Sequence, residues 1–256
     1  MAPDWLARYQ DGERSGVWHE LRQFGAAVRL PDYREQAQLV CDEMARRALH
    51  NVEVIVDRLA RHGFRAHEND DERTPTPAHL PPTERAETHA AWLDEQFGPV
   101  PLTVLSWVRI VGDVWLVGTH PQWSTSANAD PLVVQLEGSA HPEWGPIGDY
   151  LRVGRERWRE GPPEGEIETP DDRSGGGLTV LPLSPDGYHK ANVSGGLPYG
   201  VVVPDSCADG VFAGVTTMPF VSYLNWVFRH GGFPGHTGAP EQEAVRRDLA
   251  KGLLPL

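Results

Sequence analysis

The side chains best suited to chemistry lie close together in one polar segment, between two stretches rich in valine and leucine. A neutral histidine in that segment could act as a base, and a lysine or glycine N–H groups could stabilise developing negative charge. Glycines also let a ligand approach the backbone closely. The candidate binding residues of this segment are His189, Lys190, Asn192, Ser194, Gly195 and Gly196.

The same segment also has a structural interpretation. Asn192, Ser194 and the glycines are ordinary turn-forming residues, because they satisfy local hydrogen-bonding groups or adopt unusual backbone angles. The segment matches no catalytic motif, and no catalytic residue is assigned. Since loops are enriched in binding residues, we expect residues 189–196 to form a binding surface before a catalytic one.

Two other segments carry functional groups. A predicted strand ends at Gly118–Trp123, and this segment is expected to expose His120 and Trp123. Tryptophan is a common interface anchor, although it also covers sheets with its large apolar area. His230 and His236 flank a short glycine-rich loop, but two histidines without a third ligand are a weak metal signal. No metal or cofactor is predicted.

The elements that position these residues are short. Strands are predicted for residues 114–117, 131–136, 178–183, 199–203 and 210–215. Short strands joined by turns, without helices between them, favour antiparallel pairing. We therefore expect an α+β fold, with helices packed on an antiparallel sheet of about five or more strands. The turn at 188–196 would join two of these strands.

One long amphipathic helix is the clearest element. Asp32 and Glu35 form a capping box at its start, apolar residues then recur at spacings of three and four, and Gly63 ends it. His50 and Asn51 on this helix are expected to be solvated, as most polar residues on a helix surface are. Further helices are expected within residues 3–30, 84–97, 102–111, 219–228 and 240–251.

Composition divides the chain into three parts. An N-terminal helical segment covers residues 1–65, and a proline-rich, acidic linker without capacity for packing covers 66–83. The α+β domain then extends over 84–256, with a long insertion loop at 138–177. Such loops tend to be functional or mobile.

The net charge and the scarcity of lysine limit the classes of partner that we expect. The formal net charge is −13, and the only lysines are Lys190 and Lys251. Nucleic-acid binders concentrate Lys and Arg on one face, so we expect no nucleic-acid partner. An acidic surface suits a basic protein partner, because complementary potentials speed encounter. The alternative is that the charge serves solubility alone.

The sequence also indicates a compartment. Cys41 and Cys207 lie in no paired motif, so both are expected to be free, structural thiols. The N-terminus lacks the apolar core of a signal peptide, and no apolar run approaches the ~18 residues of a membrane helix. We therefore expect a cytoplasmic chain without membrane association.

From about residue 84 to 252 the order of segments follows a recognisable pattern. The matching pieces are Leu93–Phe97, Val100–Leu102, Val111–Asp113, Leu183–Asp186 and Phe220–Leu224. This order resembles the SUKH superfamily of Smi/Knr-like proteins. The resemblance implies an α+β protein-binding module, whose best-known bacterial role is immunity against secreted toxins, and it implies no catalytic residues. The chain departs from the pattern in its helical N-terminus, the 138–177 loop and the 189–196 turn.

Two functions from different classes follow. The first is a non-enzymatic protein-binding module, with a bacterial immunity or regulatory role. The alternative is a small-molecule-binding protein or enzyme with a polar site at residues 189–196. The alternative requires those groups to converge within hydrogen-bonding reach in a concave site.

Overall fold

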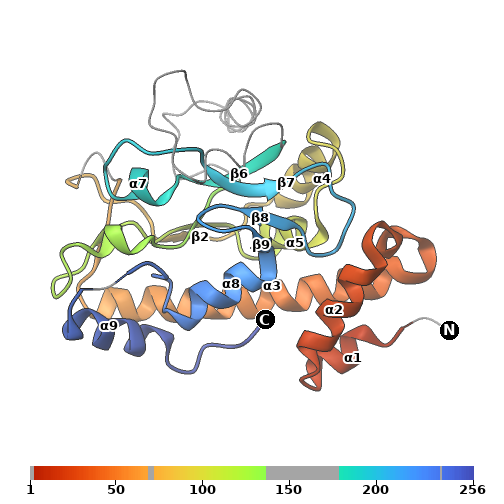
Figure 1. Cartoon of the computed structure of the whole chain (residues 1–256), viewed down its shortest axis with the longest axis horizontal. Coiled ribbons are helices and arrows are strands. Elements are labelled where there is room, and N and C mark those ends of the chain that lie inside the picture. The colour runs from red at the N-terminus through yellow and green to blue at the C-terminus, as the bar shows by residue number, and fades with distance from the viewer. Residues whose placement is uncertain (1–2, 69–71, 137–178, 237) are drawn as a thin grey trace.

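The long helix α3 (Pro31–Arg61) runs lengthwise below the sheets in the computed structural model, which describes residues 3–68, 72–136, 179–236 and 238–256 (Figure 1). Its buried residues recur on one face, as the apolar spacing predicts, and Gly63 with φ 77° lies just beyond its end. The predicted capping box is wrong. The helix begins at Pro31 without a side-chain cap, because proline's fixed φ suits the first helical position.

Three short helices precede α3, of which the first and third contact it while the second packs against the other two. These are α1 (Trp5–Gln10), α2 (Arg14–Phe24) and the 3-10 helix η1 (Gly25–Arg29), consistent with the short helices expected there. The side chain of Phe24 lies edge-on to Trp5 and to Tyr33 of α3, with ring centres 5.0 and 4.8 Å apart. The buried apolar residues of these helices belong to the same continuous core as buried residues of several strands.

Four more helices surround the sheets. They are α4 (Ala86–Gln96), α5 (Leu102–Ile110), α8 (Phe220–Arg229) and α9 (Pro240–Ala250), in agreement with the helices predicted there. α3 contacts both α5 and α9. Between α3 and α5, the Asp42 carboxylate accepts hydrogen bonds from Ser106 at 2.7 Å and from Arg109 at 2.6 Å. None of the helices among the described residues is long and apolar enough to cross a membrane.

The strands form three antiparallel sheets among the described residues. β1 (Arg65–Ala66) pairs with β4 (Gly118–Thr119). β3 (Asp113–Trp115) lies between β2 (His79–Leu80) and β5 (Val133–Val134). The largest sheet has the order β6 (Val180–Ser184), β7 (Tyr199–Val202), β8 (Val211–Ala213) and β9 (Met218–Pro219). The α+β class and the antiparallel pairing are confirmed.

The prediction of one sheet with five or more strands is wrong, because the described sheets have two to four strands. β5 and β6 lie next to each other, but among the described residues the backbone hydrogen bond between them is that from Gln135 N–H to the Leu183 carbonyl, at 2.8 Å. The next amide, that of Leu136, donates to the Asp113 carboxylate at 2.9 Å. Successive amides of a strand point to opposite sides, so the Leu136 amide faces β3 and does not extend the contact between β5 and β6.

The acidic, proline-rich segment is packed where the structure describes it, contrary to the expectation that it could not pack. His79 of β2 is paired with Val114 of β3, and the Trp115 indole donates to the His67 carbonyl at 2.9 Å. His67 and Thr76 are buried. Backbone pairing therefore compensates for the lack of large apolar residues. The proposed insertion loop at 138–177 lies outside the described residues, and the division into domains stays a prediction.

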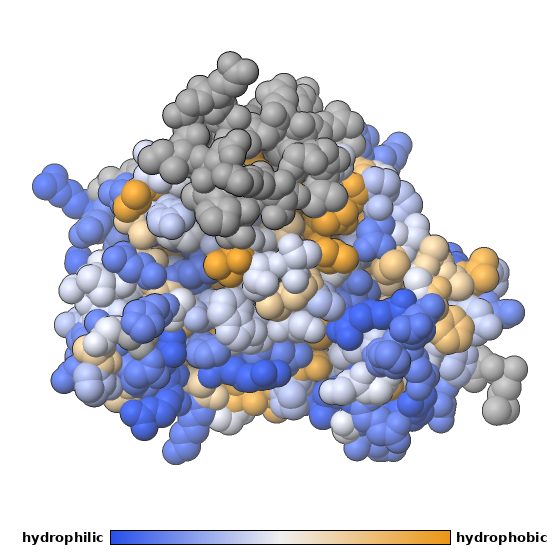
Figure 2. Space-filling view, viewed as in Figure 1, coloured by the Kyte–Doolittle hydropathy of each residue, from blue (hydrophilic) through white to orange (hydrophobic). Residues whose placement is uncertain are grey.

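The surface and the cysteines agree with the composition. In Figure 2 the lower half of the molecule, over α1 and α9, is mainly hydrophilic, while apolar side chains gather towards the upper half. Cys41 and Cys207 are free, as expected. Burial raises the pKa of the Cys41 thiol, and burial followed by a hydrogen bond to Asp205 raises the pKa of Cys207 to about 12. Both thiols are therefore protonated and unreactive at neutral pH.

The expectation that Asn51 is solvated is wrong, since this residue is fully buried. Its side-chain amide donates to the Leu254 carbonyl at 2.8 Å and its oxygen accepts from the Leu254 N–H at 2.7 Å. Asn225 of α8 bonds Leu256 in the same two-point manner, at 3.3 and 2.9 Å. These two amides attach residues 254–256 to α3 and α8.

We predict that Asn51→Ala lowers the free energy of unfolding by about 2 kcal/mol, because two buried backbone groups lose their partners. Urea denaturation followed by circular dichroism measures the change. His50→Ala is the matched control, since the neighbouring His50 is exposed and exposed positions usually change stability by less than about 0.5 kcal/mol. Equal effects of the two substitutions would contradict the assigned role of Asn51.

Candidate functional site

The turn after β6 contains a short helix, α7 (Gly187–Lys190), which Asp186 caps. One oxygen of Asp186 accepts hydrogen bonds from the N–H groups of Tyr188 and His189, at 2.7 and 3.1 Å, and the other pairs with the His189 ring. Burial alone would raise the pKa of Asp186, but the hydrogen bond and charge of His189 outweigh it and lower that pKa. Asp186 is therefore ionised at neutral pH, and His189 is engaged in holding the turn.

Gly195 lies directly against this cap. A Cβ atom at residue 195 would be 2.3 Å from one oxygen of Asp186 and 2.5 Å from the other. Any larger residue would displace the carboxylate. The glycine therefore has a packing role, rather than presenting its N–H to a ligand.

Lys190 is completely buried and forms the centre of the site. Its ammonium donates to the Asp130 carboxylate at 2.8 Å and lies 4.8 Å from the centre of the Tyr199 ring. Asp130 follows the 3-10 helix η2 (Ser126–Ala129) in left-handed backbone geometry, with φ 50°, which aspartate tolerates. The Tyr199 hydroxyl accepts from the Gly187 N–H at 3.0 Å. These contacts join α7, η2 and β7.

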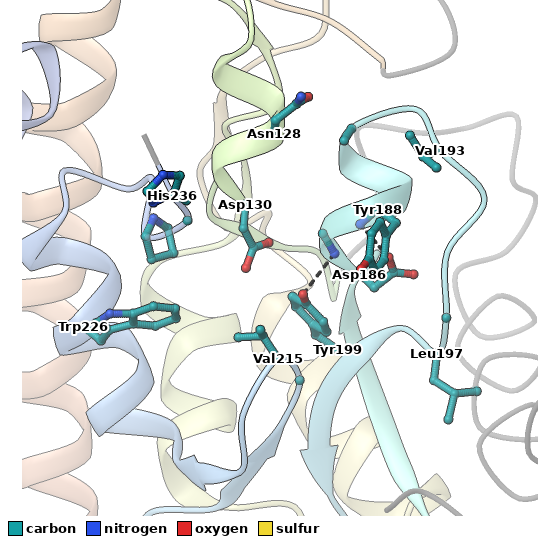
Figure 3. Close-up of a pocket in the computed structure, with 16 residues that line it drawn as sticks. Asn128, Asp130, Asp186, Tyr188, Val193, Leu197, Tyr199, Val215, Trp226 and His236 are labelled. Atoms are coloured by element: carbon teal, nitrogen blue, oxygen red, sulfur yellow. Dashed lines mark hydrogen bonds between the residues drawn. The ribbon is translucent and has the colours of Figure 1, made fainter. Parts of the chain in front are cut away.

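A pocket of about 660 Å³ opens beside these contacts (Figure 3). Ligand pockets generally have volumes of about 300–1,000 Å³. Figure 3 shows the Asp130 carboxylate pointing into the space between Trp226 of α8 and Tyr199 of β7. The described lining comprises Asn128, Asp130, Asp186, Gly187, Tyr188, Ala191, Val193, Gly196, Leu197, Tyr199, Gly214, Val215, Trp226, Pro234, Gly235 and His236.

The pocket has an apolar mouth. Tyr188, Val193 and Val215 all line it and are 58%, 54% and 45% exposed. They come from α7, from the turn that follows it and from the connection between β8 and β9. Exposed apolar side chains that cluster around a concavity often mark a binding surface, whereas single scattered ones do not.

A buried hydroxyl lies close to the ion pair. Tyr223 of α8 is 1% exposed, and its hydroxyl makes no hydrogen bond among the described residues. Its ring stacks on Phe212, with ring centres 3.7 Å apart. Burial raises the pKa of Tyr223, and the nearby charges of Asp130 and Tyr199 raise it further. This tyrosine is therefore neutral and places a polar atom within an apolar region.

The predicted site residues separate into different environments. Lys190 is buried in the ion pair, while Gly196 lines the pocket. Asn192, with φ 59°, is exposed and lines with Lys190 a smaller cavity of about 130 Å³. Ser194 is exposed and lines neither cavity, and His189 faces Asp186. The predicted polar groups do not converge on one point.

Sequence reasoning missed most of the groups that line the pocket. Asp130, Trp226 and Val215 come from three segments far from residues 189–196 in the chain. Trp226 lies in a helix that looks apolar nearly all round, so its position at a pocket gave no signal. Asp130 could have been noticed in the sequence, because aspartate is one of the few residues that adopt left-handed backbone geometry directly after a short helical turn.

The expected exposure of His120 and Trp123 is wrong, since they are only 1% and 2% exposed. Trp123 packs against Phe233, with ring centres 5.4 Å apart, and therefore covers the core. Neither residue lines the pocket beside Asp130.

His120 belongs to a directed chain of hydrogen bonds. The Gln122 N–H donates to Nδ1 of His120 at 3.1 Å, so a neutral His120 carries its proton on Nε2. That nitrogen lies 3.2 Å from Nδ1 of His62, whose Nε2 lies 3.1 Å from the Asp248 carboxylate. The chain links the end of α3 to α9 and to the segment after β4.

The other histidines do not form a metal site. Among the residues that the structure describes, no group of three or more His, Cys, Asp or Glu side chains could hold a metal ion. Nδ1 of His230 donates to the Trp226 carbonyl at 2.8 Å, while His236 is exposed at the pocket.

Comparison with protein-family models, with curated proteins and with solved structures finds no match. The resemblance to the SUKH superfamily stays a prediction. What the site can do follows from its own geometry: it offers apolar and aromatic walls, two carboxylates and an open mouth.

We predict that Lys190→Met lowers the free energy of unfolding by about 3–5 kcal/mol, because it leaves the Asp130 carboxylate buried and unpaired. The double variant Asp130→Asn/Lys190→Met should recover most of that loss, since it removes both charges and keeps a residue that tolerates left-handed geometry. Denaturant titration of both variants measures the difference. A double variant no more stable than the single one would refute this account of the pair.

We also predict that His120 makes stability pH-dependent. Burial and then the neighbouring His62 lower the pKa of His120 from its usual value of 6.5. The unfolded chain therefore binds a proton that the folded chain resists, and stability falls as the pH drops from 6.5 towards the lowered pKa. Thermal melts across this range should show a shallower slope for His120→Gln than for the wild type. His50→Gln should keep the wild-type slope; a reduced slope there instead would reject the assignment.

Proposed function

We propose that this chain is a non-enzymatic protein-binding module, which receives an anchoring side chain of its partner in the pocket between α7, β7 and α8. In many interfaces, a few side chains that fill pockets on the partner carry most of the binding energy. The contacts around them contribute little energy but exclude water. The SUKH resemblance adds a role in immunity or regulation to this proposal.

The observation that carries the proposal is the location of the exposed apolar side chains. Five large apolar residues are exposed among those that the structure describes, and three of them, Tyr188, Val193 and Val215, line this one pocket. The other two, Leu30 and Val211, do not line it. A rim of this kind is suited to a partner that covers the mouth.

The chemistry of the lining also favours binding over catalysis. No serine, threonine, cysteine or lysine is found among the described lining residues, so covalent catalysis there would depend on a carboxylate, a tyrosine or His236. His189, the base considered from the sequence, contacts Asp186 instead and does not line the pocket.

A small molecule is the alternative occupant. The volume of about 660 Å³ favours it, because this lies within the usual range for such ligands. The partner protein remains the better choice, since a small molecule within the pocket would leave the exposed ring and methyl groups at the mouth uncovered.

We predict that a photoreactive benzoylphenylalanine at position 193 or 215 cross-links one protein in cells, whereas the same residue at position 211 does not. Val211 is the matched control, because it is an exposed valine outside the pocket. The captured protein must then bind the purified chain at a fixed stoichiometry, and Val215→Asp must weaken that binding. Photo-cross-linking, mass spectrometry and calorimetry provide these measurements.

Two results would reject the proposal. The first is equal cross-linking from position 211 and from the pocket positions. The second is a native mass spectrum in which the chain carries a bound small molecule that blocks cross-linking from positions 193 and 215.

A further inference from the structure

The Asp130 carboxylate has an unused oxygen at the pocket. One oxygen accepts from Lys190 at 2.8 Å, and no described residue hydrogen-bonds the other. The side chain retains 12% exposure, although the residue as a whole is buried. Because Figure 3 shows the carboxylate pointing into the space beside Trp226, this oxygen can accept a hydrogen bond from an occupant.

Aromatic rings line the space around that oxygen. Trp226 lies on one side, and Tyr199 and Tyr188 on the other (Figure 3). The faces of aromatic rings carry negative potential and attract cations within about 6 Å, with tryptophan the most effective. Trp226 is partly exposed, and its indole N–H has no hydrogen bond with a described residue.

The charges of the lining have one sign. Asp130 and Asp186 are both carboxylates, and no lysine or arginine is found among the described lining residues. The Lys190 ammonium contacts one oxygen of Asp130 and the Tyr199 ring. It has no exposed surface, so it does not present its charge to an occupant of the pocket. The net charge of −13 adds a long-range attraction for cations.

We propose that the pocket binds the side chain of an arginine on the partner protein, with the guanidinium against Trp226 and hydrogen-bonded to the free oxygen of Asp130. This inference rests on the proposed function and names the chemistry of the anchor. An anionic side chain would face the Asp130 carboxylate and the negative faces of the rings, while the charge of Asp186 is already paired with His189.

Arginine suits this arrangement better than lysine. Its guanidinium is planar and stacks on aromatic rings, and its several N–H groups allow hydrogen bonds to a carboxylate while the stack is kept. An ammonium is more strongly hydrated and loses more on entering an apolar pocket. The methylene groups of arginine would contact Val215, which lies between Trp226 and Tyr199 in the same pocket (Figure 3).

We predict that N-acetyl-arginine methylamide binds to the full chain and shifts the indole N–H resonance of Trp226. The resonance is assigned by its loss in Trp226→Phe. N-acetyl-citrulline methylamide, which has nearly the same shape but no charge, is the matched probe and should bind at least about tenfold more weakly. The lysine analogue should also bind more weakly than the arginine analogue.

The variant Asp130→Asn/Lys190→Met removes the carboxylate without leaving a buried unpaired ammonium, and it should weaken binding of the arginine probe at least about tenfold. A dispersed spectrum establishes that this variant is folded. Trp226→Leu, followed through the methyl resonances of Val215, should also weaken binding. Val211→Ala should leave it unchanged.

The outcomes separate the two proposals. Equal binding of the citrulline or lysine probe overturns the arginine assignment, and so does the absence of any shift at the highest soluble concentration. If cross-linking from positions 193 and 215 persists in that case, the protein-binding proposal stands alone. Selective arginine binding without any cross-linked protein supports the cation site and rejects the protein-binding proposal.

Discussion

Burial of one face of α3 is the interaction on which the rest of the molecule depends. α1, η1, α5, α9 and β2 all contact this helix, and its buried residues belong to the same core as residues of several strands. The final residues of the chain are bonded to it through Asn51 and to α8 through Asn225. α8 carries Trp226, so one wall of the pocket is connected to α3 through this packing.

The opposite wall of the pocket includes α7, which is held in place by hydrogen bonds and an ion pair. α7 is a single turn of helix and has too little apolar surface to be held by packing alone. Its position is set by the Asp186 cap, by the hydrogen bond from Gly187 to Tyr199 and by the ion pair of Lys190 with Asp130. The pocket-lining residues on this small element are thus positioned by polar contacts rather than by an apolar helix face.

The elements of the fold could be predicted because their signals are local. Apolar residues recur along α3 at helical spacing, and Pro219 and Pro240 lie at the starts of α8 and α9. The joining of strands into sheets could not be predicted in the same way. It depends on individual contacts, such as the hydrogen bond from the Gln135 N–H to the Leu183 carbonyl between β5 and β6, and these arise only when distant segments meet.

The sequence points to the segment beside the pocket but not to the residues that line it. Gly196 is the one predicted binding residue in the described lining, while Lys190 faces inward, His189 is held by Asp186, and Asp130 and Trp226 come from elsewhere. A lysine in a polar turn gives no indication in the sequence that it is buried, because burial depends on an acidic partner sixty residues away. Asn51 illustrates the same limit on a helix, since its partners lie near the end of the chain.

The buried ion pair has a consequence for how fast an occupant could be captured. Any shift of α7 relative to η2 would separate Lys190 from Asp130 and leave two charges without compensation in a region of low polarity. Alternative arrangements of the wall are therefore sparsely populated, and the pocket has its binding shape before a ligand arrives. Little ordering entropy is lost on association. The association rate would then be set by diffusion and electrostatic steering. Differences in affinity between ligands would lie mainly in their dissociation rates.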